Sequence, residues 1–282
     1  MIKMNFGNVA PSFMIIGTQK GGTTALHEYL IQHPKLIAPK KKELHFFDTY
    51  NKLDFKRYLK QFPKKYLTNK ISFESTPRYL YYPGVARNIY RYNSKMKLII
   101  LLRDPVKRAY SAWNMYKQMS MSNHMVNFFK KNEEKCPNEQ IYTLLCKTEE
   151  FPAFEEWTTF ELENEVNAEW IEPSIIRRGY YSEQIKEYLK IFDREQLLFI
   201  DSETLKKDTL GVLNTVAYFL EIPDFNGMDL NLEPKHKREY SEPLNEMLYD
   251  DLLKHFQNKN KGLEELTNLK LDWMNQNTDY NV

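Results

Sequence analysis

A dense run of glycine, lysine and threonine near the N-terminus is the first place where this sequence could do chemistry. An apolar stretch at 13–17 leads into GTQKGGTT at 17–24, and a helical pattern follows. A glycine-rich turn lets backbone N–H groups point at an anion, and the helix N-terminus adds partial positive charge. A lysine adds a full charge and two threonines add hydroxyl donors. The residues expected to bind a phosphate or sulfate are Lys20, Gly21, Gly22, Thr23 and Thr24.

The position of the lysine in this loop argues against a nucleoside triphosphate site. The phosphate loop of nucleoside triphosphatases reads G-x-x-x-x-G-K-[ST]. Counting from Gly17, Gly22 fits the second glycine, but Thr23 stands where the lysine belongs. Lys20 lies inside the loop instead, so the sequence offers no proper seat for a Mg²⁺-bound triphosphate.

A second group that could bind an anion follows the apolar run at 97–102. Arg103 comes directly after this predicted strand, and Asp104-Pro105 is typical of a helix start. Ligands of open α/β sheets bind at the carboxyl ends of strands, where an arginine can grip a phosphate with two hydrogen bonds. In the predicted helix, Ser111 lies on a different face from the apolar Tyr110 and Trp113.

These motifs together resemble a known family. FxxIGxxKGGTTxL at 13–26 is similar to the 5′-phosphosulfate loop of sulfotransferases that use 3′-phosphoadenosine-5′-phosphosulfate (PAPS). It is closest to the branch of heparan sulfate sulfotransferases and their bacterial relatives. RDPxxRxxS at 103–111 resembles the 3′-phosphate motif of that family, which implies donor contacts from Arg103 and Ser111. The resemblance spans about residues 12 to 258, and the product it implies is adenosine 3′,5′-bisphosphate.

A basic cluster, KHKR at 235–238, is open to two interpretations. A cluster of this kind is usually a solvated face. Family members often carry a K-x-G-R-like turn near the C-terminus that closes over the 3′-phosphate of the donor. The glycine of that turn is absent here, and the resemblance implies contacts from Lys237 and Arg238.

Sulfuryl transfer requires a base for the acceptor proton, a cation for the leaving phosphate, and alignment of the reacting groups. KELHFFD at 42–48 resembles the family segment K-E-x-x-[FY]-F, which implies Glu43 as the general base, and Lys20 is the expected cation. In an extended chain Glu43 and His45 project to the same side and could share one acceptor hydroxyl or amine. A structural role for His45 is equally open, and Asp48 is a weaker candidate.

The acceptor is the least defined part of this hypothesis. ESTP at 74–77 resembles the segment near the acceptor, where animal members often have lysine at the position of Ser75. The loss of that lysine, together with an acidic stretch described below, favours a neutral or cationic acceptor. We expect a small polar metabolite or an uncharged sugar, with sulfation of a polysaccharide as the alternative.

The elements that must position these residues can be predicted from apolar patterns. Short apolar runs at 13–17, 70–73, 97–102 and 196–200 are typical of buried parallel strands. Helical patterns follow at 23–33, from Asp104 onward, at 181–192 and at 242–256. The alternation predicts an α/β fold, and the family resemblance implies a P-loop-like parallel β-sheet flanked by helices. We expect one domain over 1–282, with a mainly helical acidic insertion at about 119–175.

Charge and composition narrow the classes of partner. The chain of 282 residues has 40 basic and 38 acidic side chains, and a net charge of +2 argues against a nucleic-acid binder. Twelve glutamates against two lysines lie between 133 and 172. The first ten residues contain no apolar signal core, the apolar runs are too short to span a bilayer, and Cys136 and Cys146 are the only cysteines. We therefore expect a cytoplasmic protein with no membrane partner and no metal.

Two other functions remain open at this stage. The run LLFID at 197–201 could be a strand that ends in a Mg²⁺-binding aspartate, as in a P-loop kinase. A non-catalytic module would bind adenosine 3′,5′-bisphosphate without turnover. Magnesium-dependent ATP affinity would favour the first alternative, and the second predicts no loss of function in Glu43→Gln.

Overall fold

The computed structural model describes residues 7–49, 53–121, 150–164, 174–233 and 243–276. The chain divides into two compact units. The first unit comprises Met1–Arg103, Ser182–Arg238 and Gly262–Leu271, and the second comprises Asp104–Tyr181, Glu239–Lys261 and Asp272–Val282. Each unit is described below by itself, and the expectation of one domain over 1–282 stays a prediction.

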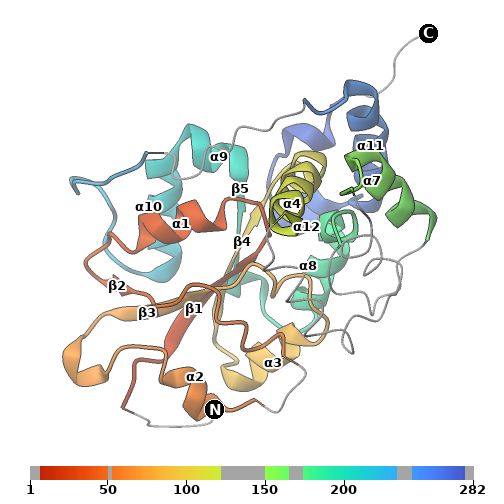
Figure 1. The fold of residues 1–282 in the computed structure, drawn as a ribbon. Coiled ribbons are helices and arrows are strands. Elements are labelled where there is room, and N and C mark those ends of the chain that lie inside the picture. The colour runs from red at the N-terminus through yellow and green to blue at the C-terminus, as the bar shows by residue number, and fades with distance from the viewer. Residues whose placement is uncertain (1–6, 50–52, 122–149, 165–173, 234–242, 277–282) are drawn as a thin grey trace. The chain divides into compact units, whose positions relative to one another are not determined.

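The first unit is built on a parallel sheet of five strands in the order β2-β3-β1-β4-β5 (Figure 1). The strands are β1 (Pro11–Gly17), β2 (Leu36–Ile37), β3 (Ile71–Ser75), β4 (Lys97–Leu102) and β5 (Leu197–Asp201). Strand β1 is central and pairs with β3 on one side and β4 on the other. Loops that follow β3, β1 and β4 therefore emerge side by side at one edge of the sheet, where ligands of such sheets bind.

The strands confirm the α/β prediction and most of its boundaries. The run predicted at 97–102 is β4, and those predicted at 13–17, 70–73 and 196–200 differ from β1, β3 and β5 by one or two residues at their ends. Only β2 was not predicted. It has only two residues and lies at the edge of the sheet, and two residues are too few to form a recognisable strand pattern in the sequence.

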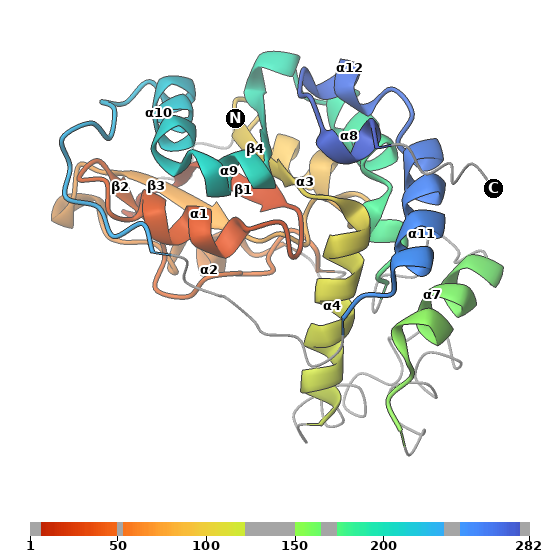
Figure 2. The same cartoon turned by 90° about the horizontal axis from the view of Figure 1, so that it is seen from above.

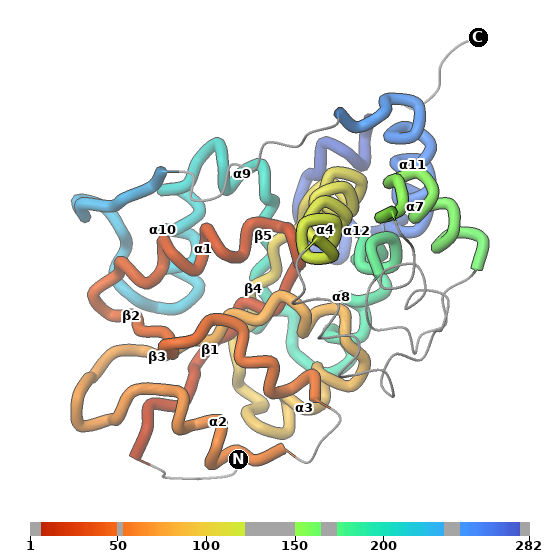
Figure 3. Tube along the Cα trace, in the orientation of Figure 1, coloured from red at the N-terminus to blue at the C-terminus, as the bar shows by residue number. Residues whose placement is uncertain are grey.

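Helices cover both faces of this sheet (Figures 1 and 2). One face packs against α1 (Thr23–Leu30) and α10 (Thr209–Leu220), through a core that includes Phe13, Leu26 and Val216. The opposite face lies under α2 (Phe55–Leu59) and α3 (Val85–Tyr92). The tube in Figure 3 follows the chain from β1 through α1 to the edge strand β2 and back to β3.

The remaining elements of the first unit are short or lie late in the chain. They are η1 (Lys65–Leu67), α8 (Tyr181–Leu189), η4 (Arg194–Gln196), α9 (Ser202–Lys207) and α12 (Leu263–Thr267). The predicted helices at 23–33 and 181–192 end earlier than expected, at Leu30 and Leu189. In both cases the apolar pattern continues into a turn that remains buried, since His33 is 0% and Phe192 is 3% exposed.

The second unit contains α4 (Pro105–Ser120), α7 (Phe154–Glu163), η3 (Arg177–Gly179), α11 (Glu246–Lys259) and η5 (Asp272–Met274). As predicted, Asp104 caps α4: its carboxylate accepts from the Val106 and Lys107 amides at 2.9 and 3.0 Å. Helix α7 packs on α4 through the rings of Trp113 and Phe154. It is the described part of the acidic region expected to be helical, and the rest of that region is outside the described residues.

Buried polar contacts fix the second unit internally. The Glu161 carboxylate on α7 accepts hydrogen bonds from the amides of Ile175 and Ile176 at 2.7 and 2.8 Å. Arg108 on α4 is fully buried and donates to the Ile175 carbonyl. Among the described residues of both units, no helix is long and apolar enough to cross a membrane.

Candidate functional site

The glycine-rich loop turns sharply between β1 and α1. Gly22 has a φ of 97°, in the left-handed region that glycine adopts without strain. A Cβ at Gly21 would lie 3.0 Å from the Thr18 carbonyl oxygen and 3.1 Å from that of Leu101. The loop therefore requires glycine at both positions. Helix α1 begins without a side-chain cap, so its first N–H groups remain available to an anion.

Contacts from neighbouring strands fix the loop in place. The Thr18 amide donates to the Leu101 carbonyl at 3.0 Å, and the Gly21 amide donates to the Thr18 carbonyl at 2.9 Å. Arg103, at the end of β4, donates through Nη1 to the Lys20 carbonyl at 2.9 Å. Lys20 itself has a φ of 67°, which is uncommon for a side chain of this type. The structure thus brings Arg103 into contact with the loop that carries Lys20, although the two residues are 83 positions apart in the sequence.

Two buried polar atoms of the loop have no partner within the described residues. They are the Thr18 hydroxyl and the side-chain carbonyl oxygen of Gln19. Thr18 is 3% exposed. Buried polar groups in native proteins are normally hydrogen-bonded, and the exceptions call for a ligand or a water.

The segment that carries Glu43 is anchored to the end of the adjacent strand. The Glu43 amide donates to the Ser75 carbonyl, the last residue of β3, at 3.2 Å. Glu43 and His45 have φ angles of 62° and 50°, so the expectation of an extended chain here is wrong. The reason is that the backbone is held from outside: the Phe46 and Phe47 amides bond to the Tyr79 hydroxyl instead of continuing a strand.

The side chains predicted for this segment nevertheless come together. His45 Nε2 lies 3.7 Å from Glu43 Oε2, and His45 Nδ1 lies 2.8 Å from Asp48 Oδ2. Lys42 Nζ pairs with Glu43 Oε1 at 2.6 Å, and Arg78 Nε lies 3.7 Å from Asp48 Oδ2. Asp48 is buried at 1% side-chain exposure, whereas Glu43 and His45 are partly open to solvent.

These contacts set the charge states of the cluster. Burial of His45 disfavours its charged form, but hydrogen bonds to Asp48 and Glu43 outweigh this and raise its pKa to about 9. Burial opposes ionisation of Glu43 as well, yet hydrogen bonds from His45 and Lys42 lower its pKa to about 2. At neutral pH the site therefore presents an ionised Glu43 beside a protonated His45.

A buried carboxylate, that of Glu74, lies on β3. Glu74 is 0% exposed and accepts from the hydroxyls of Tyr58, Thr76 and Tyr79, the last two at 2.8 and 2.7 Å. Burial raises the pKa of Glu74, and the three hydroxyl donors act in the other direction. The sequence had pointed to the segment 74–77 only through its resemblance, and nothing in the pattern indicated the two tyrosines.

Sequence reasoning also missed His27 on α1. Its ring lies against Phe73 of β3 at 5.1 Å, and its Nδ1 is buried with no hydrogen-bond partner among the described residues. Burial, aided by the charge of Lys42, lowers the pKa of His27 to about 4. A helix position facing the core gave no reason to single it out.

The structure also gives the positions of other residues predicted to bind the donor. Thr23 is buried at the first position of α1 and Thr24 is half-buried beside it. Ser111 is 2% exposed on α4, in the second unit, whereas Arg103 belongs to the first. Lys237 and Arg238 lie outside the described residues.

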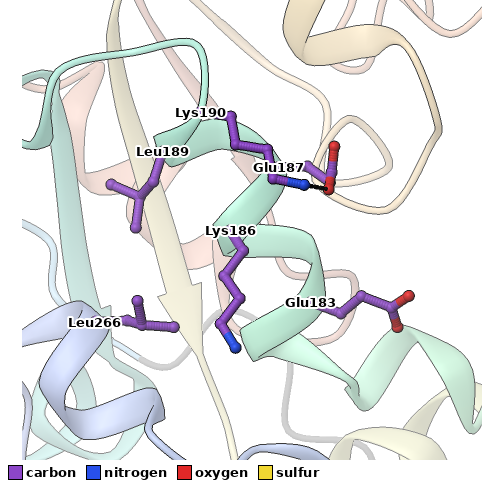
Figure 4. Close-up of a pocket in the computed structure, with 6 residues that line it drawn as sticks. All are labelled: Glu183, Lys186, Glu187, Leu189, Lys190 and Leu266. Atoms are coloured by element: carbon purple, nitrogen blue, oxygen red, sulfur yellow. Dashed lines mark hydrogen bonds and ion pairs between the residues drawn. The ribbon is translucent and has the colours of Figure 1, made fainter.

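A shallow pocket on the first unit has a different character (Figure 4). It is lined by α8 and by Leu266 of α12, with the ion pair between Lys190 and Glu187 at its rim. None of the predicted site residues lines it.

In the described parts of the chain, no group of three His, Cys, Asp or Glu side chains is placed to hold a metal ion.

Comparisons with known proteins agree with these observations. A family model described as sulfotransferase domain matches residues 10–260. The membrane-associated sulfotransferase kil1 of Dictyostelium discoideum is 26% identical, over 94% of this chain and 67% of its own length. Human heparan sulfate glucosamine 3-O-sulfotransferase 5 is 30% identical over 76% of this chain and 54% of its own length. The chain thus spans about half the length of that human relative.

A solved structure gives the same result for the fold. The crystal structure of a sulfotransferase from Alicyclobacillus acidocaldarius superposes with a TM-score of 0.65 and 25% identity, covering 94% of this chain and 98% of that one. The predicted parallel sheet flanked by helices is therefore confirmed by both the topology and this neighbour.

Proposed function

Since this chain belongs to the sulfotransferase domain family, a family of transferase enzymes, we propose that it transfers a sulfuryl group from PAPS to a hydroxyl or amine of a small polar metabolite or an uncharged sugar. One arrangement carries the proposal. Lys20 follows the end of β1, and the Glu43 amide is bonded to Ser75 at the end of the adjacent β3. A cation and a carboxylate thus occupy neighbouring positions at the edge of the sheet where ligands bind.

The loop after β1 fits the phosphosulfate end of PAPS, which supplies the sulfuryl group when bound. Support comes from the close backbone turn at Gly21, the uncapped start of α1, and the unpaired polar atoms of Thr18 and Gln19. The residues that would hold this end of the donor are Lys20, Gly21, Gly22, Thr23 and Thr24. Arg103 would contact the 3′-phosphate, and Ser111, Lys237 and Arg238 are proposed for the same group on motif resemblance alone.

Each residue of the cluster has a defined task in this reaction. The acceptor O–H or N–H bond breaks as the acceptor atom bonds to sulfur, and the Glu43 carboxylate receives the proton. Glu43 is ionised at neutral pH, the state that a base requires. The sulfur–oxygen bond to the leaving phosphate breaks, and the charge of Lys20 stabilises the oxygen that carries the electrons. Protonated His45 is a hydrogen-bond donor that orients the acceptor atom, and Asp48 holds its ring.

Three variants test these roles. Lys20→Ala and Arg103→Ala are expected to weaken binding of adenosine 3′,5′-bisphosphate, measured by calorimetry, because each removes a contact to the nucleotide. Glu43→Gln is expected to leave that affinity unchanged and to lower turnover of labelled PAPS by about 100-fold or more, since a base acts only in the transition state. Turnover like that of the wild type in Glu43→Gln would remove Glu43 from this role, and magnesium-dependent ATP binding would overturn the donor.

A second acceptor class, a polyanionic glycan, is favoured by one surface. Five exposed cations lie within thirteen residues over α2 and η1: Lys56, Arg57, Lys60, Lys64 and Lys65. The human relative described above is named for action on heparan sulfate, a polyanion. A panel of neutral sugars, amines and sulfated glycans, assayed with labelled PAPS, separates the two classes. A neutral acceptor predicts a KM that is insensitive to salt, and a polyanion predicts a KM that rises steeply as charges are screened.

A further inference from the structure

The backbone of the Glu43–Asp48 segment requires support from elsewhere in the fold. Glu43 and His45 both have positive φ angles, and neither is a residue that adopts this region readily. Such conformations persist only where the surrounding structure over-determines them. The contacts that hold this segment therefore also decide how its side chains meet an acceptor.

Besides the bond from the Glu43 amide to the Ser75 carbonyl, a tyrosine hydroxyl supports this segment. Tyr79 Oη accepts from the amide of Phe46 at 2.9 Å and from that of Phe47 at 3.3 Å, and it donates to Glu74 at 2.7 Å. The three contacts form one chain of hydrogen bonds from the backbone next to His45 to a carboxylate on β3. The Tyr79 carbonyl in turn accepts from the hydroxyl of Tyr188 at 2.8 Å, so the tyrosine is held at both ends.

A second contact links Glu74 to the same segment. Tyr58 donates its hydroxyl to Glu74, and its ring stacks on Phe46 with centroids 4.3 Å apart and planes at 15°. Burial and the charge of Glu74 raise the pKa values of Tyr58 and Tyr79 well above the ordinary value, so both remain protonated donors. Glu74 therefore reaches the segment through one hydrogen bond and one stacked ring.

The carboxyl oxygens of Glu74 accept from three hydroxyl donors, those of Tyr58, Thr76 and Tyr79. Both tyrosine hydroxyls therefore point their protons at Glu74. The lone pairs of Tyr79 Oη are then left for the two backbone amides. A buried carboxylate is costly, and packing alone would be served better by an apolar side chain. Its presence at 0% exposure indicates a role in orienting the tyrosines.

We propose that Glu74 is a positioning residue for sulfuryl transfer, which acts through Tyr79 to hold His45 and Glu43 in the geometry that the reaction requires. This inference rests on the function proposed above for those two residues. Glu74 itself touches no reacting atom, because it is fully buried and its carboxylate is surrounded by the hydroxyls of Tyr58, Thr76 and Tyr79.

The first test is Tyr79→Phe, which removes the hydroxyl and keeps the ring. Two backbone amides lose their acceptor, so kcat is expected to fall by about 10- to 100-fold while KM for PAPS changes by less than about twofold. Tyr92→Phe is the matched control, since Tyr92 belongs to the same aromatic cluster but its hydroxyl makes no hydrogen bond among the described residues. Equal kcat values in Tyr79→Phe and the control would overturn the proposal.

A double-mutant cycle tests whether Glu74 acts through Tyr79. If it does, Glu74→Gln combined with Tyr79→Phe lowers kcat no further than the stronger single variant does. Multiplied effects of the two substitutions would show that Glu74 acts independently of Tyr79, and the proposal would fail.

The third measurement does not depend on catalysis. The pKa of His45, followed by NMR in the folded protein, is expected to fall in Tyr79→Phe because the contacts to Asp48 and Glu43 loosen. A role in stability alone would lower the unfolding free energy and leave the pKa of folded His45 unchanged, which would contradict the inference. If Glu43→Gln keeps full activity but this pKa shift is observed, the proposed function fails and the positioning of the segment stands.

Discussion

The charge on His45 is the feature of the site that can be perturbed most directly. Its ring donates through Nδ1 to Asp48 at 2.8 Å, and the Asp48 carboxylate is 1% exposed. Glu43 lies farther away, at 3.7 Å from Nε2, and Arg78 acts in the opposite sense. Asp48→Asn removes the nearer charge and keeps a side chain of the same shape, so we expect the His45 pKa to fall from about 9 toward its ordinary value.

The size of the effect follows from these values. The difference between a pKa of about 9 and the ordinary 6.5 is about 2.5 units, or about 3.4 kcal/mol at about 1.36 kcal/mol per unit. The His45 side chain is 38% exposed, so solvent screens part of this energy. We therefore expect Asp48→Asn to lower the pKa by only about 1 to 1.5 units, which corresponds to about 1.4–2 kcal/mol.

Two assays measure this change. An NMR titration of the His45 ring gives the pKa in the folded protein, and the alkaline limb of kcat/KM is expected to move down by the same amount if protonated His45 orients the acceptor. Asp54→Asn is the matched control, because Asp54 caps α2 and asparagine caps equally well while one charge is lost. An unchanged His45 pKa in Asp48→Asn would refute this account of the site.

The same pKa also links His45 to the pH dependence of unfolding. Because its pKa in the folded state is raised, the stabilisation from His45 is complete below pH 6.5 and is lost as pH rises through about 9. Asp48→Asn is expected to flatten the stability curve in this window, as measured by chemical denaturation at a series of pH values.

Three further outcomes are expected elsewhere in the chain. Gly21→Ala should lower the free energy of unfolding by about 1–3 kcal/mol and abolish nucleotide binding, because the new Cβ meets two backbone carbonyls at 3.0 and 3.1 Å; calorimetry checks both. The pKa of Glu43 is lowered from 4.5 to about 2, so the stability that Glu43 contributes is present above pH 4.5 and is lost as pH falls toward 2. Acid denaturation of Glu43→Gln should therefore show a smaller loss of stability over this pH range. Glu161→Gln should destabilise the second unit by about 1–3 kcal/mol, because one of the two oxygens that accept from the Ile175 and Ile176 amides is replaced by an NH₂ donor. Denaturant unfolding measures this change, and an unchanged free energy of unfolding would contradict the reasoning.

Parts of the molecule that depend on local patterns were predictable from the sequence. A run of apolar residues at 97–102 can only be a buried strand in this context, and Asp104-Pro105 has few uses other than starting a helix. The glycine loop was equally clear, because its turn and its close approach to the Leu101 carbonyl demand glycine. The prediction of a cytoplasmic location is not tested by these features and stays a prediction.

Parts that depend on distant contacts were not predictable. The φ angles of Glu43 and His45 are positive although neither residue is glycine, so no local sequence pattern predicts them. Asp48 was a weak candidate because its partnership with His45 exists only in that bent backbone. The Tyr79 hydroxyl meets amides 32 and 33 residues away, a relation that only the folded chain defines.

The way in which Glu43 is anchored bears on how such a chain can diversify. The anchor is the main-chain carbonyl of Ser75, which every amino acid supplies equally well. The side chain at 75 therefore takes no part in this anchor, and since it is 1% exposed, a residue that fits the same space can replace it without disturbing the anchor. Substitutions at position 75 could therefore change which acceptor the protein binds, while the main-chain bond that positions Glu43 stays the same.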